Sequence, residues 1–229
     1  MKIHGLQKLT LLDYPSKVAC TVFIAGCNMR CPFCHNFELV EDIPEAVCDD
    51  KELLSFLEKR KGMLDGVCLT GGEPLLNPGT PELMRAIKEM GYSVKLDTNG
   101  TSPGTLARVI EKGLCDYVAM DIKNSRERYA VTAGLESFDT SPVEECVRIL
   151  ASGDTDYELR TTVVRELHDE DSFRDISEFC AGAKRFVLQS FVDRDTVRFS
   201  GLSAPDADEL ARYKAILSET IGDVSIRGV

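Results

Sequence analysis

The chain has 229 residues, a formal net charge of −11 at pH 7 and a pI near 4.8. Because no basic stripe offsets this acidic total, nucleic acid backbones are excluded as partners. The chain is 43% hydrophobic and 28% charged, as in soluble globular proteins, and it has no apolar run long enough to span a bilayer. Its start lacks the apolar core of a signal peptide, and its nine cysteines therefore suggest a reducing compartment, so we expect a cytoplasmic protein without membrane contacts.

Short apolar, β-branched runs alternate with amphipathic stretches of helical length along the whole chain. Strands are predicted over residues 18–25, 67–70, 93–97, 117–121, 157–164 and 185–191, with a short strand-like tail at 224–226. Helices are predicted over residues 49–60, 80–90, 103–112, 142–151, 169–180 and 206–220, several of them opened by a capping Asp, Thr or Ser. This alternation predicts an α/β fold of βα units on a parallel sheet. No linker divides the sequence, so we expect one domain spanning residues 1–229.

Three cysteines, Cys27, Cys31 and Cys34, lie within eight residues after the first predicted strand. Structural zinc usually has four protein ligands from two separated pairs, and a second pair is missing here. A cubane iron-sulfur cluster held by three thiolates would leave one iron open to a small molecule, which suggests catalysis. The alternatives are that His35 is a fourth ligand, that His35 is a polar loop residue, or that the cysteines are free thiols or a disulfide with one spare.

Polar residues follow the next predicted strands where each one ends. These residues are the Gly71-Gly72-Glu73-Pro74 turn, the Asp97-Thr98-Asn99-Gly100 segment, and Asp121 with Lys123. Because the carboxyl ends of parallel strands form the active face of both barrels and doubly wound sheets, we expect these residues to converge with the cysteine loop.

The cysteine loop and the Gly71-Gly72-Glu73-Pro74 turn together resemble the radical S-adenosylmethionine (SAM) enzymes, whose signature is a CxxxCxxC loop with an aromatic residue before its last cysteine. Phe33 stands at that aromatic position. The resemblance extends over most of the chain and is greatest to the activating proteins of anaerobic ribonucleoside-triphosphate reductase and, beyond them, to the pyruvate formate-lyase activating enzymes.

The resemblance implies an incomplete (β/α)6 TIM-like barrel with a 4Fe-4S cluster on Cys27, Cys31 and Cys34. SAM would chelate the fourth iron, and its reductive cleavage would give a 5'-deoxyadenosyl radical that abstracts hydrogen from a glycine of a partner protein. The expected partners are therefore a glycyl-radical enzyme, here anaerobic ribonucleoside-triphosphate reductase, and a flavodoxin or ferredoxin as electron donor.

Several residues have implied roles at the SAM site. Glu73 would bind the methionyl ammonium, with Gly71 and Gly72 allowing the backbone to approach the ligand; the alternative is an exposed residue in a tight turn. Asp97, Thr98 and Asp121 would contribute to a monovalent cation site beside the SAM carboxylate, and Lys123 would help to hold the ligand. The alternatives are helix caps for Asp97 and Thr98, and a surface ion pair for Asp121 with Lys123.

Three further residues complete the predicted site. Arg160, inside an apolar strand, needs a carboxylate partner, either from the ligand or from a structural ion pair. Asn99 lines the ligand pocket or serves only as a turn residue. Gln189 ends the sixth strand where the pyruvate formate-lyase activating enzymes have a histidine, so its role is open.

Two other functions fit the same motifs. One is a radical SAM enzyme that acts on another glycyl-radical enzyme, a peptide or a small molecule. The other is a non-enzymatic iron-sulfur protein for electron transfer, which would not bind SAM.

Overall fold

The computed structural model describes residues 1–228, and these residues form two compact units. The first unit contains Met1–Asn28, Glu38–Thr98 and Gly104–Val118. The second contains Met29–Phe37, Asn99–Pro103 and the chain from Ala119 onward. No helix among the described residues is both long and apolar enough to cross a bilayer.

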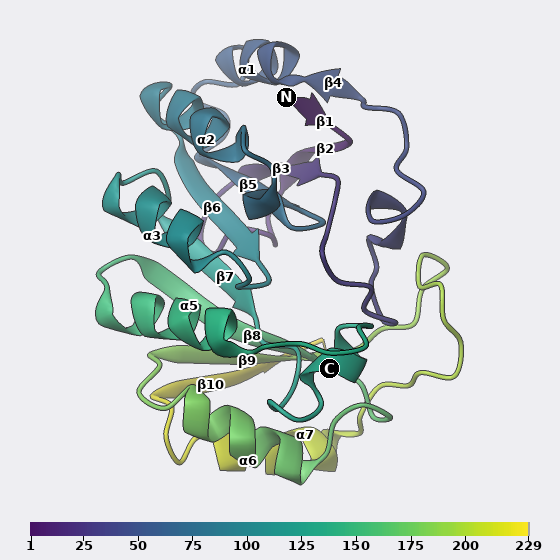
Figure 1. Ribbon diagram of the computed structural model, residues 1–229. Helices are drawn as coiled ribbons and strands as arrows, with labels where there is room; N and C mark the ends of the chain where they lie inside the picture. The colour runs from purple at the N-terminus through teal and green to yellow at the C-terminus, as the bar shows by residue number, and fades with distance from the viewer. Residues whose placement is uncertain (229) are drawn as a thin grey trace. The chain divides into compact units, whose positions relative to one another are not determined.

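The first unit is built on a sheet with the strand order β2-β3-β5-β6 (Figure 1). Its strands are β1 (Lys2–Ile3), β2 (Gly5–Thr10), β3 (Ala19–Ile24), β4 (Cys48–Asp49), β5 (Gly66–Gly71) and β6 (Ser93–Thr98). Its helices are α1 (Asp50–Glu58), α2 (Thr80–Glu89) and α3 (Pro103–Glu111), with the short 3-10 helices Phe37–Leu39 and Pro74–Leu76. Strands β3, β5 and β6 are parallel, as predicted, whereas β2 is antiparallel to β3.

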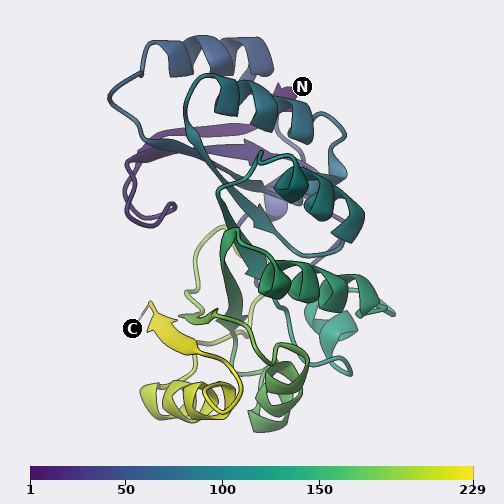
Figure 2. The ribbon, with the colours of Figure 1, turned by 90° about the vertical axis from the view of Figure 1, so that its left-hand side faces the viewer.

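The second unit repeats the βα pattern with the strand order β8-β9-β10, all parallel. Strand β7 (Tyr117–Asp121) runs from the first unit into the second. The remaining elements are α4 (Tyr129–Thr132), α5 (Ser141–Ser152), β8 (Asp156–Val163), α6 (Glu170–Phe179), β9 (Arg185–Ser190), α7 (Ala207–Leu217) and β10 (Asp223–Arg227). Helices α6 and α7 lie side by side (Figure 2), and Phe173 stacks on Tyr213 with ring centroids 4.4 Å apart.

The predicted capping residues begin three of the helices. Asp49, Asp169 and Asp206 each accept a hydrogen bond from the backbone N–H three residues later, and the side chain of that later residue bonds back to the cap. These reciprocal bonds satisfy N–H groups that a helix otherwise leaves without partners, so the predicted helix starts are correct to within one residue.

The elements that the sequence did not predict are short or polar. Strands β1 and β4 have two residues each and pair with one another, and α4 is a single turn. Strand β2 has a largely solvent-accessible sequence, GLQKLT, at the edge of its sheet. An edge strand needs little apolar surface, so hydrophobic periodicity does not reveal it.

Buried His168 ties the loop after β7 to β8 in the second unit. Its Nε2 donates to the Lys123 carbonyl oxygen at 2.8 Å, and its Nδ1 accepts from the Val164 N–H at 3.1 Å. Burial lowers the pKa of His168 below its usual value, although the backbone hydrogen bonds to Lys123 and Val164 act in the opposite direction. The native state therefore binds a proton at this imidazole less readily than the unfolded chain does.

We expect this histidine to make stability fall with acidity. Below a pH of about 6.5 the imidazole binds a proton in the unfolded chain more readily than in the native state. The free energy of unfolding should therefore drop by up to about 1.4 kcal/mol per pH unit as the pH falls. Urea unfolding of the wild type and His168→Gln between about pH 7.5 and 5.5 measures this term, since other titrating groups are shared. Parallel pH profiles for the two proteins would contradict it.

Candidate functional site

The turn after β5 packs against the backbone that leads into the cysteine loop. The Gly72 N–H donates to the Ile24 carbonyl at 2.8 Å, and the Glu73 N–H donates to the Gly26 carbonyl at 2.7 Å. A Cβ on Gly71 would lie 2.4 Å from the Ile24 oxygen, and one on Gly72 would lie 2.1 Å from the Gly26 oxygen. In the structure the two glycines thus permit close approach to the chain directly before Cys27, a contact that the sequence did not reveal.

Glu73 is buried, with 1% of its surface exposed, so the alternative of an exposed turn residue is wrong. Its Oε1 accepts hydrogen bonds from the Leu75 N–H at 3.0 Å and the Thr98 hydroxyl at 2.9 Å. A carboxylate held by donors from two segments has a fixed orientation, as recognition of an ammonium group requires.

Asp97 and Thr98 lie at the end of β6 and do not cap a helix, because α3 begins only at Pro103. The Asp97 carboxylate accepts from the Thr70 hydroxyl at 3.1 Å and is paired with the ammonium of Lys95. The first unit therefore brings Glu73 and Thr98 into direct contact, with Asp97 adjacent to Thr98 in the same strand.

In the second unit, Asp121 forms ion pairs with two cations. Its Oδ2 lies 2.9 Å from Lys123 Nζ, and its Oδ1 accepts from Arg160 Nε. Burial opposes ionisation of Asp121, but Arg160 and Lys123 outweigh it and hold the pKa of this carboxyl well below its usual range. Burial likewise opposes the charged form of Lys123, and Asp121 outweighs it, so the pKa of Lys123 is raised. The pair is partly buried rather than a surface pair, and Arg160 has a protein carboxylate as partner.

The cysteine loop from Met29 to Phe37 is anchored within the second unit. The Arg30 N–H donates to the Ala133 carbonyl at 2.8 Å, and the Lys123 ammonium lies 6.0 Å from the Phe33 ring centroid. His35 stacks on Phe191 with centroids 6.0 Å apart, and its Nε2 lies 2.7 Å from the Val192 carbonyl oxygen. These contacts agree with the interpretation of His35 as a loop residue.

Two further predicted residues are Asn99, whose side chain bonds within a turn, and Gln189, which lies on a strand. The Asn99 side-chain oxygen accepts from the Thr101 N–H at 3.1 Å and hydroxyl at 2.7 Å, which is a turn-forming pattern. Gln189 lies on β9 opposite Thr162 of β8. No ligand contact of either residue follows from these bonds.

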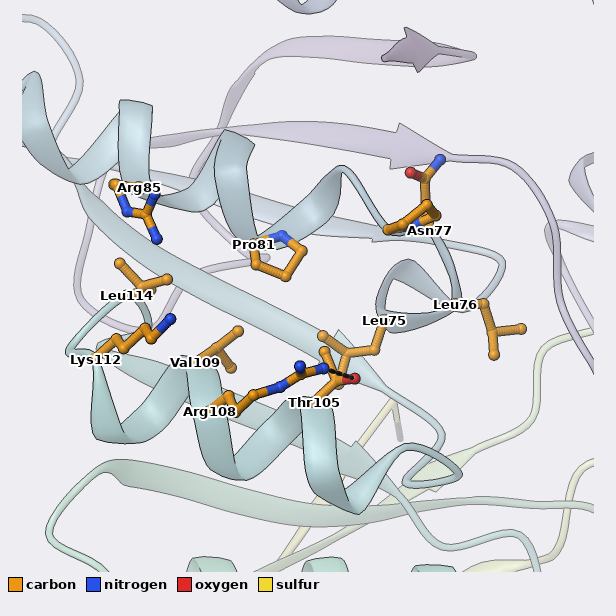
Figure 3. A pocket seen from close by; sticks show the side chains of 11 residues that line it. Leu75, Leu76, Asn77, Pro81, Arg85, Thr105, Arg108, Val109, Lys112 and Leu114 are labelled. Carbon is orange, nitrogen blue, oxygen red and sulfur yellow. Dashed lines mark hydrogen bonds between the residues drawn. The ribbon is translucent and has the colours of Figure 1, made fainter.

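A pocket of about 430 Å³ lies in the first unit between α2 and α3 (Figure 3). Arg85 of α2 and Arg108 and Lys112 of α3 line it together with apolar residues such as Leu75. None of the predicted site residues lines this pocket, so it is separate from the candidate site.

Residues 21–179 match the model of the Radical SAM superfamily, which is well over half of the chain. The chain belongs to this superfamily. Over 99% of its length it is 29% identical to 96% of a Methanocaldococcus jannaschii protein provisionally named a glycyl-radical enzyme activating enzyme. It is also 31% identical to the pyruvate formate-lyase-activating enzyme of Clostridium pasteurianum, over 54% of this chain and 52% of that protein.

Solved structures confirm the radical SAM fold, an incomplete TIM-like barrel. A radical SAM methyltransferase from Sphaerobacter thermophilus superposes with a TM-score of 0.70 at 14% identity, covering 96% of this chain and 69% of that one. A domain of pyruvate-formate lyase-activating enzyme from Bacteroides vulgatus gives 0.58 at 20% identity, covering 71% and 99%. At these identities the likeness supports the fold alone.

The family implies a 4Fe-4S cluster and SAM, and the chemistry of the chain fits this cluster. Cys27, Cys31 and Cys34 are soft thiol donors of the kind that iron-sulfur clusters require. Burial raises the pKa of the Cys34 thiol, so a bound metal must displace its proton. Among residues 1–228 no three His, Cys, Asp or Glu side chains are arranged as a metal site, and the assignment rests on the family and this donor set.

A second observation supports a bound group near the loop. The Tyr129 side chain is fully buried, and within the described part of the chain its hydroxyl has no hydrogen-bond partner. A buried hydroxyl without a partner costs about 1–3 kcal/mol, so such a donor is typical of a place where a polar group binds.

Sequence reasoning missed Lys95, Gly134 and Tyr129. Lys95 had a usable signal, because it is a charged residue inside an apolar strand, as Arg160 is. Gly134 and Tyr129 had none, since a glycine in a loop and an aromatic residue near a helix are ordinary features.

Proposed function

We propose that the chain is an activase that installs a glycyl radical on anaerobic ribonucleoside-triphosphate reductase. The end-to-end similarity to the M. jannaschii protein, which covers 99% of this chain and 96% of that one, supports the activase. The choice of the reductase as partner rests on the sequence resemblance alone.

The proposed cluster ligands are Cys27, Cys31 and Cys34. When bound, the cluster and SAM supply the radical that removes a hydrogen atom from the partner's glycine. Glu73, oriented by Thr98, binds the SAM ammonium, while Gly71 and Gly72 hold the Glu73 turn against the start of the loop. Charged residues of the second unit are proposed to surround the carboxylate of SAM.

Lys123 and Arg160 are the proposed cationic contacts of the SAM carboxylate, and Asp121 orients both of them. Phe33, Asn99 and Gln189 are proposed to line the ligand pocket. The monovalent cation predicted at Asp97, Thr98 and Asp121 is not part of this proposal, because both carboxylates already have side-chain cations as partners.

The proposed setting is the cytoplasm, with flavodoxin or ferredoxin as the electron donor. Both donors are small soluble proteins that reduce iron-sulfur clusters, and the thiol chemistry of nine cysteines suits a reducing compartment.

Anaerobic mixing of the reconstituted protein, SAM, reductant and the reductase tests the function. We expect a glycyl doublet in the EPR spectrum of the reductase and release of 5'-deoxyadenosine that depends on the reductase. A doublet with another glycyl-radical enzyme alone would reassign the partner. SAM cleavage driven only by a peptide or small metabolite would contradict the activase, and a reduced cluster whose spectrum ignores SAM would indicate an electron-transfer protein.

A further inference from the structure

Lys95 is a buried lysine in the first unit that has no role in the proposed chemistry so far. It lies on β6, opposite Cys68 of β5, and only 2% of its surface is exposed. An ammonium group leaves water at a large cost unless a charged partner and hydrogen bonds compensate for it. The contacts of Lys95 therefore indicate which group its charge compensates.

Those contacts centre on Asp97, two residues along the same strand. The Lys95 ammonium pairs with Asp97 Oδ1 and lies 3.7 Å from the Cys68 sulfur. The other carboxylate oxygen of Asp97, Oδ2, accepts from the Thr70 hydroxyl at 3.1 Å. Both oxygens of Asp97 are thus held by side chains of β5 and β6, in a fixed orientation next to Thr98.

The charges of this pair cancel inside the first unit. The partly buried carboxylate of Asp97 is stabilised by a positive charge nearby, and Lys95 provides it from within the chain. A free monovalent cation bound at the same carboxylate would lie beside an ammonium of like charge, which is unfavourable in a poorly solvated site.

We propose that Lys95 is a positioning residue that takes the place of a monovalent cation at Asp97. It compensates the charge of Asp97 and fixes its orientation, so that SAM binding does not depend on sodium or potassium. This inference rests on the proposed function, because it takes Asp97 as a residue of the SAM site.

The affinity of the reconstituted enzyme for SAM tests the role of Lys95. We measure it by equilibrium dialysis in potassium chloride and in tetramethylammonium chloride of equal ionic strength. The large organic cation cannot enter a site built for a small ion. We expect the wild type to bind SAM equally in both salts, within about twofold. Lys95→Met should bind about tenfold or more weakly in tetramethylammonium, because the partly buried charge of Asp97 has lost its partner. Potassium should restore part of the affinity.

Three results would overturn the inference: a wild type that needs potassium, a Lys95→Met enzyme that binds normally in both salts, or a loss of affinity that potassium does not relieve. The wild-type comparison needs no variant, so it stands even if Lys95→Met does not fold. Matched removal of both charges, Lys95→Met with Asp97→Asn, should make whatever affinity remains insensitive to potassium.

Failure of the proposed function has a different signature, namely no SAM binding by the wild type in either salt. In that case the melting temperature of the cluster-free full-length chain still tests Lys95. Potassium should raise the melting temperature of Lys95→Met and leave that of the wild type and the double variant unchanged. An equal response of all three proteins would reject the role of Lys95.

Discussion

Replacement of Cys31 by alanine is expected to abolish cluster binding and SAM cleavage. Changing residues that only support a metal ligand typically costs 10–100-fold, so loss of a thiolate ligand should leave less than about 1% of wild-type cleavage. Iron and sulfide content and the visible spectrum of the anaerobically reconstituted protein measure the first effect. The yield of 5'-deoxyadenosine under reducing conditions measures the second.

Cys48 offers a matched control for the same substitution at Cys27 and Cys34, whereas Cys31 is buried. It is a partly exposed cysteine outside the loop, as Cys27 and Cys34 are partly exposed within it. Cys48→Ala should retain full iron content and cleavage, and Cys27→Ala and Cys34→Ala should behave as Cys31→Ala does. A Cys31→Ala protein with normal iron content would show that the ligand set is wrong.

Gly134→Ala is expected to destabilise the second unit and to displace the cysteine loop. Gly134 has a φ of +69°, and a Cβ there would lie 2.1 Å from the Arg30 carbonyl oxygen. The left-handed backbone alone costs a non-glycine residue about 1–2 kcal/mol, and the clash adds to it, so the free energy of unfolding should fall by more than about 3 kcal/mol. Urea unfolding measures this change, and iron content after reconstitution reports the position of the loop.

Gly182→Ala separates the two causes. Gly182 has a φ of +82°, and a Cβ at this residue would have nothing within 4 Å, so the position shares the backbone strain without the clash. The variant should lose only about 1–2 kcal/mol and bind iron normally. An equal loss of stability in both variants would mean that the loop yields to the added methyl group.

The strands of the fold were predictable because their apolar, β-branched runs are buried. Residues 93–97 and 117–121 were placed to within one residue of β6 and β7, and the helices starting after Asp49, Asp169 and Asp206 followed from their caps. The unpredicted β2 and α4 lack such signals, because an edge strand and a single helical turn are stabilised mainly by their tertiary neighbours.

The sequence predicted which residues belong to the candidate site but not their hydrogen-bond and ion-pair partners. The buried position of Glu73 and its bond from Thr98 could not be distinguished from an exposed turn in the sequence. Arg160 was expected to need a carboxylate, and only the structure identified Asp121, 39 residues away, as that partner. Lys95 carried the same signal as Arg160, a charge inside an apolar strand, but only the structure shows that it is buried and paired with Asp97.

The sequence by itself determined the chemistry of this protein: three closely spaced thiols and a series of βα units whose carboxyl ends carry polar residues. Spacing along the chain is enough for this, because ligand type and strand period are local properties. Only the tertiary structure decided which charged residues pair. Lys95 pairs with Asp97, and Lys123 and Arg160 pair with Asp121. The physical reason is that the cost of burying a charge depends on the groups within a few ångströms of it, whatever their separation in the chain.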